Sequence, residues 1–196
     1  MPLKSEDEKV TQKFLTRPRF ILDSCVLVSA GKSDEGLRQI STLLDSPYPV
    51  IIPAPCLLEV EIGSEKDRSK LFDELERFLR GREVLDPERA RQILARGGQI
   101  PKHVLYAPST IEYENARAVL LRIAENSGLG NRRIMDLRID VLIYFCADLF
   151  RAIIVTQNER DFDVIALHSK SGTQEKSSPI LTIQQAFDSL STIVEI

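Results

Sequence analysis

The chain has 196 residues, of which 43% are hydrophobic and 28% are charged, and a chain of this kind can bury the core of one ordinary globular domain. Its 26 lysines and arginines stand against 29 aspartates and glutamates, a formal net charge of -3, which excludes a protein that coats nucleic acid by bulk positive charge. The longest apolar stretch covers only residues 141–147, whereas a membrane helix needs about 20 apolar residues, and the polar, acidic N-terminus is unlike a signal peptide.

The three cysteines give no sign of a disulfide framework or of a zinc site. Cys25, Cys56 and Cys146 are far apart, form no CxxC pair and lie among apolar residues. Neither histidine, His103 or His168, is close to a cysteine in the sequence. We therefore expect three reduced thiols in or near the core of a cytoplasmic protein that has no contact with a membrane.

The first part of the chain alternates short apolar runs with helical patterns. Residues 1–18 are charged and lack periodicity, so we expect a flexible arm there and a single domain over 19–196. Apolar runs at 20–22 and 49–53 predict two buried strands. The helical patterns of this part lie at 26–30, at 37–44 and from about residue 55 onward.

The middle of the chain is predicted to be mainly helical. Apolar residues recur at helical spacing between 66 and 80, which predicts an amphipathic helix. Asp86 and Pro87 are the residue types of an N-cap and a first helical position, so a helix is expected over 87–96. A short strand at 104–106 and a helix from Ser109 or Thr110 to residue 127 follow.

The last part of the chain contains the clearest strand. Residues 152–156 are apolar up to a final threonine, which is typical of a strand in a parallel sheet. A helix that begins near Met135 or Ile139 and ends at Phe150 precedes this strand. After it we expect a short turn or helix at 162–167, a loop at 168–179, a strand at 180–183 and a helix at 184–190.

Short apolar strands that alternate with amphipathic helices predict an α/β fold. Such elements form a parallel sheet that is covered by helices on both faces. No internal repeat and no break in composition divides the chain. Ligands of these sheets bind at the carboxyl ends of the strands, so polar residues directly after strands are the first candidates for a site.

Acidic residues take this position repeatedly. Asp23 follows the first strand, Glu59 lies in the first turns of the helix after the second strand, and Asp140 opens an apolar helix. Asn158 and Asp161 follow the clearest strand. Any one of these residues alone fits an ordinary helix cap, and the case for a site depends on their shared placement.

A cluster of carboxylates is costly, because burial and mutual repulsion raise the pKa of each one. A divalent cation removes both costs, and oxygen ligands without a Cys/His cluster favour Mg²⁺ or Mn²⁺ over zinc. Such a metal lowers the pKa of a bound water and stabilises charge on phosphate oxygens. The pattern therefore indicates a metal-dependent site for phosphodiester hydrolysis.

Four segments resemble the motifs of PIN-domain ribonucleases. Residues 20–27 are similar to the opening motif, an apolar strand followed by Asp-Ser or Asp-Thr, and residues 53–60 resemble the second motif, in which a glutamate follows a strand. Residues 140–147 and 153–162 are similar to the third and fourth motifs, an aspartate that opens an apolar helix and a strand that ends in Thr-x-Asn before Asp-Phe. The order and the spacing agree over residues 20–183.

The resemblance implies a three-layer α/β/α sandwich and an endoribonuclease that leaves a 5'-phosphate and a 3'-hydroxyl. Many small relatives are toxins of toxin–antitoxin pairs, so the expected partners are an RNA substrate, an antitoxin protein and a second copy in a homodimer. Ser24 and Thr156 would be supporting hydroxyls. The metal ligands that the resemblance implies are Asp23, Glu59 and Asp140, with Asp161 or Asn158 in a fourth position.

Three features leave alternatives open. Asp136 lies one helical turn before Asp140, so either aspartate fits the third ligand position. Cys25 stands where many relatives have asparagine. Arg132 and Arg133 form either a phosphate track that positions RNA or an ordinary solvated face.

Two other functions compete with the nuclease. A non-catalytic PIN-like module that binds RNA or a protein is favoured by Cys25 and disfavoured by the near-complete set of acids. A receiver-like or phosphatase-like domain also collects acids at strand ends, but it needs a lysine after another strand, and the sequence has none at such a place.

Overall fold

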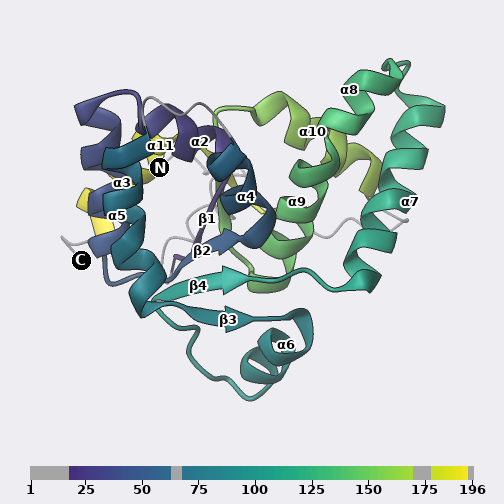
Figure 1. The fold of residues 1–196 in the computed structure, drawn as a ribbon. Coiled ribbons are helices and arrows are strands. Elements are labelled where there is room, and N and C mark those ends of the chain that lie inside the picture. Colours follow the sequence, from purple (N-terminus) through teal and green to yellow (C-terminus); the bar gives the residue numbers. More distant parts are fainter. Residues whose placement is uncertain (1–17, 63–67, 170–177, 194–196) are drawn as a thin grey trace, which may run out of the picture.

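The computed structural model describes residues 18–62, 68–169 and 178–193. Six strands form one sheet in the order β3-β4-β2-β1-β5-β6, and every neighbouring pair is parallel (Figure 1). The strands are β1 Phe20–Leu22, β2 Val50–Pro53, β3 Glu83–Leu85, β4 His103–Tyr106, β5 Ile153–Val155 and β6 Ile180–Leu181. Residues 1–17 of the predicted arm and 170–177 of the predicted loop lie outside the described residues.

The centre of the sheet is built from the apolar runs of the sequence. Strand β1 lies between β2 and β5, with Phe20 in register with both Val50 and Ile153. Every residue of these three strands is buried, as parallel strands with helices on both faces require. The carboxyl ends of β1, β2 and β5 therefore lie side by side at one edge of the sheet.

Ten helices lie within the described part of the chain. They are α2 Ser24–Ala30, α3 Asp34–Asp45, α4 Ala54–Ile62, α5 Arg68–Gly81, α6 Pro87–Ala95, α7 Thr110–Asn126, α8 Asn131–Asp136, α9 Arg138–Phe150, α10 Glu159–Ser169 and α11 Ile183–Ile193. None of the helices described is long and apolar enough to cross a bilayer.

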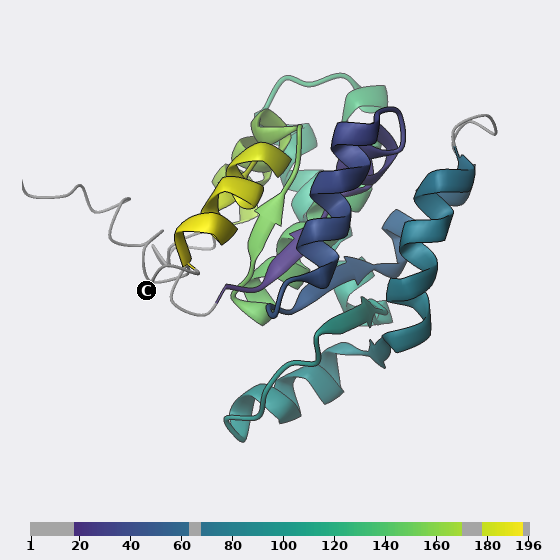
Figure 2. The ribbon, with the colours of Figure 1, turned by 90° about the vertical axis from the view of Figure 1, so that its left-hand side faces the viewer.

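The helices form two layers, one on each face of the sheet. Figure 2 looks onto one layer, in which α11, α3 and α5 lie side by side, and Gln39 of α3 donates to Gln184 of α11 at 2.6 Å. On the other face α9 contacts β1, β2 and β5, and the helices α7, α9 and α10 pack against one another (Figure 1). The predicted α/β fold, a three-layer α/β/α sandwich with a parallel sheet, is confirmed.

Several helix boundaries follow the predicted capping residues. The Asp86 carboxylate accepts from Arg89 N at 2.8 Å, with Pro87 in the first turn of α6. Ser109 is the N-cap of α7, and its N–H donates to Glu112 at 3.1 Å. Each contact satisfies a backbone donor that the first turn of a helix leaves unpaired.

Other elements differ from the prediction. Strand β3 was not expected, because it is a three-residue strand at the edge of the sheet whose first two residues are exposed and which therefore lacks an apolar run. Helix α10 is longer than the predicted 162–167 and continues into the predicted loop. Strand β6 ends at Leu181, two residues early, because α11 already begins at Ile183.

Candidate active site

Asp23 lies at the carboxyl end of β1, where the strand leads directly into α2. Its backbone N–H donates to Val155 O at 3.1 Å, which holds it against the end of β5. The carboxylate caps α2 by accepting from Cys25 N at 3.4 Å. Its Oδ2 accepts from Thr156 Oγ1 at 2.6 Å and from Cys25 Sγ at 2.9 Å. Groups from the end of β5 and from the first turn of α2 therefore fix this buried residue.

Glu59 reaches the same place from α4, the helix that follows β2. The Ser24 hydroxyl donates to Glu59 Oε2 at 2.5 Å and lies 3.3 Å from Asp23 Oδ1. Because one hydroxyl contacts both carboxylates, the separation of these two oxygens cannot exceed the sum of the two distances. Ser24 therefore couples the positions of the two acids. Glu59 itself is exposed to solvent.

Asp140 lies in the first turn of α9 and is only 9% exposed. Its pKa is raised to about 8, first by burial and then by the negative charges of Asp23, Asp161 and Glu59, while Arg133 lowers it. Within the described residues, no group donates a hydrogen bond to the Asp140 carboxylate. This side chain therefore lies in the field of three other acids without a donor of its own.

Asp161 is the fourth acid of the site and the third that is buried, and it lies in the first turn of α10. One carboxylate oxygen forms an ion pair with Arg133 of α8, and the other accepts a short hydrogen bond from the Asn158 amide. Asn158 is itself fixed, because its backbone N–H donates to Thr156 Oγ1 at 2.9 Å. The side-chain amide of Asn158 thus supports Asp161, and its nitrogen faces the carboxylate.

The structure separates the two candidates for the third ligand. Leu137 divides α8 from α9, and its N–H donates to Ile134 O at 3.2 Å. Of the two predicted helix starts, the one near Met135 is therefore wrong and the one near Ile139 is confirmed, because α9 begins at Arg138. Asp136 ends α8 and is exposed, whereas Asp140 is buried and senses the other acids. Of the two candidates, Asp140 is thus the one that lies near the acids Asp23, Glu59 and Asp161.

Two contacts of the site were not predicted from the sequence. Cys25 lies against Asp23, and burial followed by the charge and hydrogen bond of that aspartate raises its pKa to about 12. Arg133 pairs with Asp161, whereas from the sequence we expected either a phosphate track or a solvated face for Arg132 and Arg133. The contact of Cys25 had a signal in the sequence, because Cys25 lies in the first turn of a helix that Asp23 could cap. The ion pair had none, because it joins side chains that are 28 residues apart.

The chemistry of the four acids fits a hard divalent cation. All are oxygen donors, and the pKa of one of them, Asp140, is raised by burial and then by the like charges around it. Among the described residues, however, no three His, Cys, Asp or Glu side chains already stand together as metal ligands. Ser24 donates a hydrogen bond to Glu59, and both Arg133 and Asn158 donate to Asp161. Two of the four acids are therefore bound by protein groups in this structure.

Comparisons with known proteins found a similar solved structure but no matching family model or curated protein. No family model matches the sequence, and no curated protein matches it. Among solved structures, the chain is similar to VapBC2 from Rickettsia felis bound to a DNA fragment from its promoter, with 15% sequence identity and a TM-score of 0.46. The alignment covers 83% of this chain and 97% of that one.

Proposed function

We propose that the protein is a divalent-metal-dependent endoribonuclease of the PIN-domain type. The observation that carries the proposal is the environment of Asp140, a buried carboxylate without a hydrogen-bond donor among the described residues and in the field of Asp23, Glu59 and Asp161. Such an arrangement is unfavourable by itself, and a cation relieves it. Strongly shifted groups of this kind concentrate at functional sites.

Mg²⁺ or Mn²⁺ is the proposed cofactor. Asp23, Glu59, Asp140 and Asp161 would hold it, and Asn158 would contribute its amide oxygen if the amide turned away from Asp161. When bound, the metal supplies a water of lowered pKa and stabilisation of charge on the phosphate. This chemistry suits hydrolysis of an RNA phosphodiester to a 5'-phosphate and a 3'-hydroxyl.

The remaining residues of the site position the acids. Thr156 and Cys25 hold Asp23 by hydrogen bonds, and Ser24 bridges Asp23 to Glu59. Arg133 is half-exposed beside Asp161, so the part of its guanidinium that faces solvent is available to a phosphate oxygen. Arg132, exposed on the same helix, would add to the attraction for the RNA backbone.

A cleavage assay tests the proposal. We expect Mn²⁺-dependent cleavage of a mixed RNA pool by the wild-type chain and its loss in Asp23→Asn, which keeps the ability to cap α2. Asp136→Asn is the matched control, since it removes an exposed carboxylate outside the cluster and should leave cleavage unchanged. Equal activity in the wild type and in Asp23→Asn would refute catalysis by this site.

We further propose that the protein acts in the cytoplasm as a homodimeric toxin that a small antitoxin protein inhibits. A nuclease that degrades cellular RNA is harmful to its own cell, which is why a dedicated inhibitor is expected. Expression in a bacterial host should stop growth with the wild type and not with Asp23→Asn. Normal growth with an active wild-type enzyme would contradict the toxin role.

The alternative is a non-catalytic PIN-like module that binds RNA or protein. The ion pair between Asp161 and Arg133 favours it, because an acid already neutralised by an arginine has less need of a metal. RNA binding of equal strength with and without Mn²⁺, together with no cleavage, is the result that would support this alternative.

A further inference from the structure

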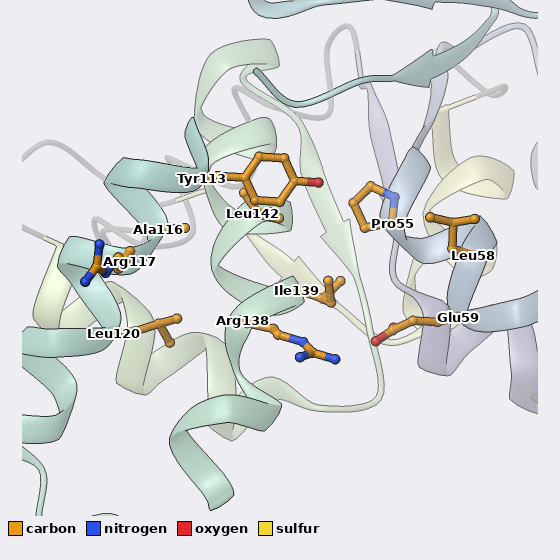
Figure 3. A pocket seen from close by; sticks show the side chains of 10 residues that line it. All are labelled: Pro55, Leu58, Glu59, Tyr113, Ala116, Arg117, Leu120, Arg138, Ile139 and Leu142. Carbon is orange, nitrogen blue, oxygen red and sulfur yellow. The ribbon is translucent and has the colours of Figure 1, made fainter. Parts of the chain in front are cut away.

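An open groove of ≈ 370 Å³ lies beside the acidic cluster, between α4, α7 and α9 (Figure 3). Its walls are mainly apolar and include Pro55 of α4, Leu120 of α7 and both Ile139 and Leu142 of α9. The volume is in the lower part of the range typical of small-molecule sites. The groove is therefore large enough for one small ligand, or for a part of similar size of a larger ligand.

Besides Glu59, three polar side chains line this apolar groove. Tyr113 of α7 is 49% exposed, and Figure 3 shows its ring over the groove with the hydroxyl directed towards Pro55. Arg117, one turn further along α7, and Arg138 of α9 are exposed, and neither forms an ion pair with the residues that the structure describes. An aromatic face with two guanidinium groups that form no ion pair suits a ligand that has both a flat ring and negative charge.

The groove is continuous with the acidic cluster. Glu59 lines the groove and also accepts the hydrogen bond from Ser24, the hydroxyl that contacts Asp23. Arg138 extends towards Glu59 in Figure 3 and is two residues from Asp140 in the same helix. A ligand in the groove would thus have one end at the place where we propose that the phosphodiester is cleaved.

We propose that this groove is the subsite for one nucleotide of the RNA substrate, next to the scissile phosphate. The base would stack on Tyr113 against the apolar wall, while Arg117 and Arg138 would bind the flanking phosphates. This inference rests on the proposed nuclease function and names the part of the chain that receives the substrate. An RNA occupant is favoured over a peptide helix, because such a helix needs a long groove that accepts anchors over two turns.

RNA binding tests the role of Tyr113 without cleavage. In an Asp23→Asn background, binding of a fluorescently labelled single-stranded RNA of mixed sequence is measured in the presence of Mg²⁺. Tyr113→Ala should raise the Kd about tenfold, the usual effect of losing one stacked base, and Tyr113→Phe should restore tight binding. Ile111→Ala is the matched control, since Ile111 is 66% exposed on the same helix and does not line the groove.

Salt dependence tests the two arginines separately from the stacking. Each phosphate contact that is lost should reduce the slope of log K against log salt by about 0.7 for a single strand. Arg117→Gln and Arg138→Gln are each expected to show this reduction. Arg96→Gln, which removes an exposed charge at the end of α6, should leave the slope unchanged.

The outcomes separate this inference from the nuclease proposal. If the wild type cleaves RNA but Tyr113→Ala binds RNA as tightly as Ile111→Ala does, the subsite is wrong and the nuclease stands. If no metal-dependent cleavage occurs but Tyr113→Ala still weakens RNA binding, the groove is an RNA site and the nuclease is wrong. If the groove variants keep full RNA affinity and lose binding of a protein partner, the groove is a protein-docking surface and the subsite is overturned.

Discussion

Glu112 and Asp140 are both buried carboxylates, 6% and 9% exposed, and both lie in the first turn of a helix. Glu112 accepts hydrogen bonds from the Tyr106 hydroxyl and from Ser109 N, so its oxygens have partners inside the protein. Asp140 has no hydrogen-bond donor among the described residues and three acids around it. Burial of a carboxylate is therefore not by itself a sign of function.

The partners of the two carboxylates explain the difference. Burial, and then the hydrogen bond to Glu112, raises the pKa of Tyr106, so the phenol keeps its proton and remains a donor at neutral pH. Around Asp140 the neighbouring charges have the same sign as its own, and Arg133 alone opposes them. The first arrangement stabilises the fold, whereas the second is unfavourable in the absence of a cation.

The largest effect is expected on catalysis. Asp140→Asn should lower Mn²⁺-dependent RNA cleavage at least about a hundredfold, because loss even of groups that only support metal ligands costs 10- to 100-fold. Glu112→Gln removes a buried carboxylate of similar exposure and should leave the activity per folded molecule within about twofold of the wild type. Cleavage rates at saturating Mn²⁺ measure both. Comparable losses in the two variants would break the comparison.

The next effect is on stability, and here the change at Glu112 should be the costly one and the change at Asp140 the harmless one. Glu112→Ala leaves the buried Tyr106 hydroxyl without its acceptor and removes the partner of Ser109 N, which should cost about 1–3 kcal/mol. Above about pH 8, where the Asp140 carboxyl group is ionised, Asp140→Asn removes a repelled charge and should not lower stability in the absence of metal. Urea unfolding with a chelator present measures the free energy of each variant. A large destabilisation by Asp140→Asn would show that its carboxylate has a structural role instead.

The dependence of stability on pH should identify Asp140 directly. Its pKa is raised to about 8 in the folded chain, so the folded state holds the proton more tightly than the unfolded state does. The resulting stabilisation is fully present below the ordinary aspartate pKa of about 3.9 and is lost as the pH rises through about 8. Without metal, the wild type should therefore lose more stability over this window than Asp140→Asn, by about 5 kcal/mol, because each of the about four pKa units corresponds to about 1.4 kcal/mol. Parallel curves for the two proteins would contradict the raised pKa.

The smallest effect concerns Arg133, whose guanidinium group forms an ion pair with Asp161. Arg133→Gln removes its ion pair with Asp161 and the positive charge that lowers the pKa of Asp140. Because Arg133 competes with a metal for the same acids, the variant should bind Mn²⁺ about two- to tenfold more tightly when RNA is absent. Calorimetric titration checks this, with Arg132→Gln as the neighbouring control. Weaker binding by Arg133→Gln would mean that the arginine organises the metal site.

The sequence predicts the parts of this molecule that depend on local pattern. Strands β1, β2 and β5 are continuous apolar runs, and Asp86 and Ser109 are found at the helix starts that their chemistry favours. Strand β3 escapes prediction because an exposed edge strand of three residues has no buried pattern to reveal it. The placement of acids after strands could likewise be predicted, since parallel strands end at a common edge.

The sequence does not predict which hydrogen-bond and ion-pair partners the acids have. The contact between Arg133 and Asp161 joins two helices that are distant in the chain, and no periodicity encodes it. The break at Leu137 that moves Asp136 away from the helix of Asp140 depends on tertiary packing of a buried leucine. Side-chain partners across elements are set by the folded structure, so they require coordinates.

The central claim is that the acids around Asp140 bind a divalent cation, and calorimetric titration of the full chain with Mn²⁺ in the absence of RNA tests it most directly. We predict saturable binding that weakens at least about tenfold in Asp140→Asn and is unchanged in Glu112→Gln. The same Mn²⁺ affinity in the wild type and in Asp140→Asn would contradict the claim.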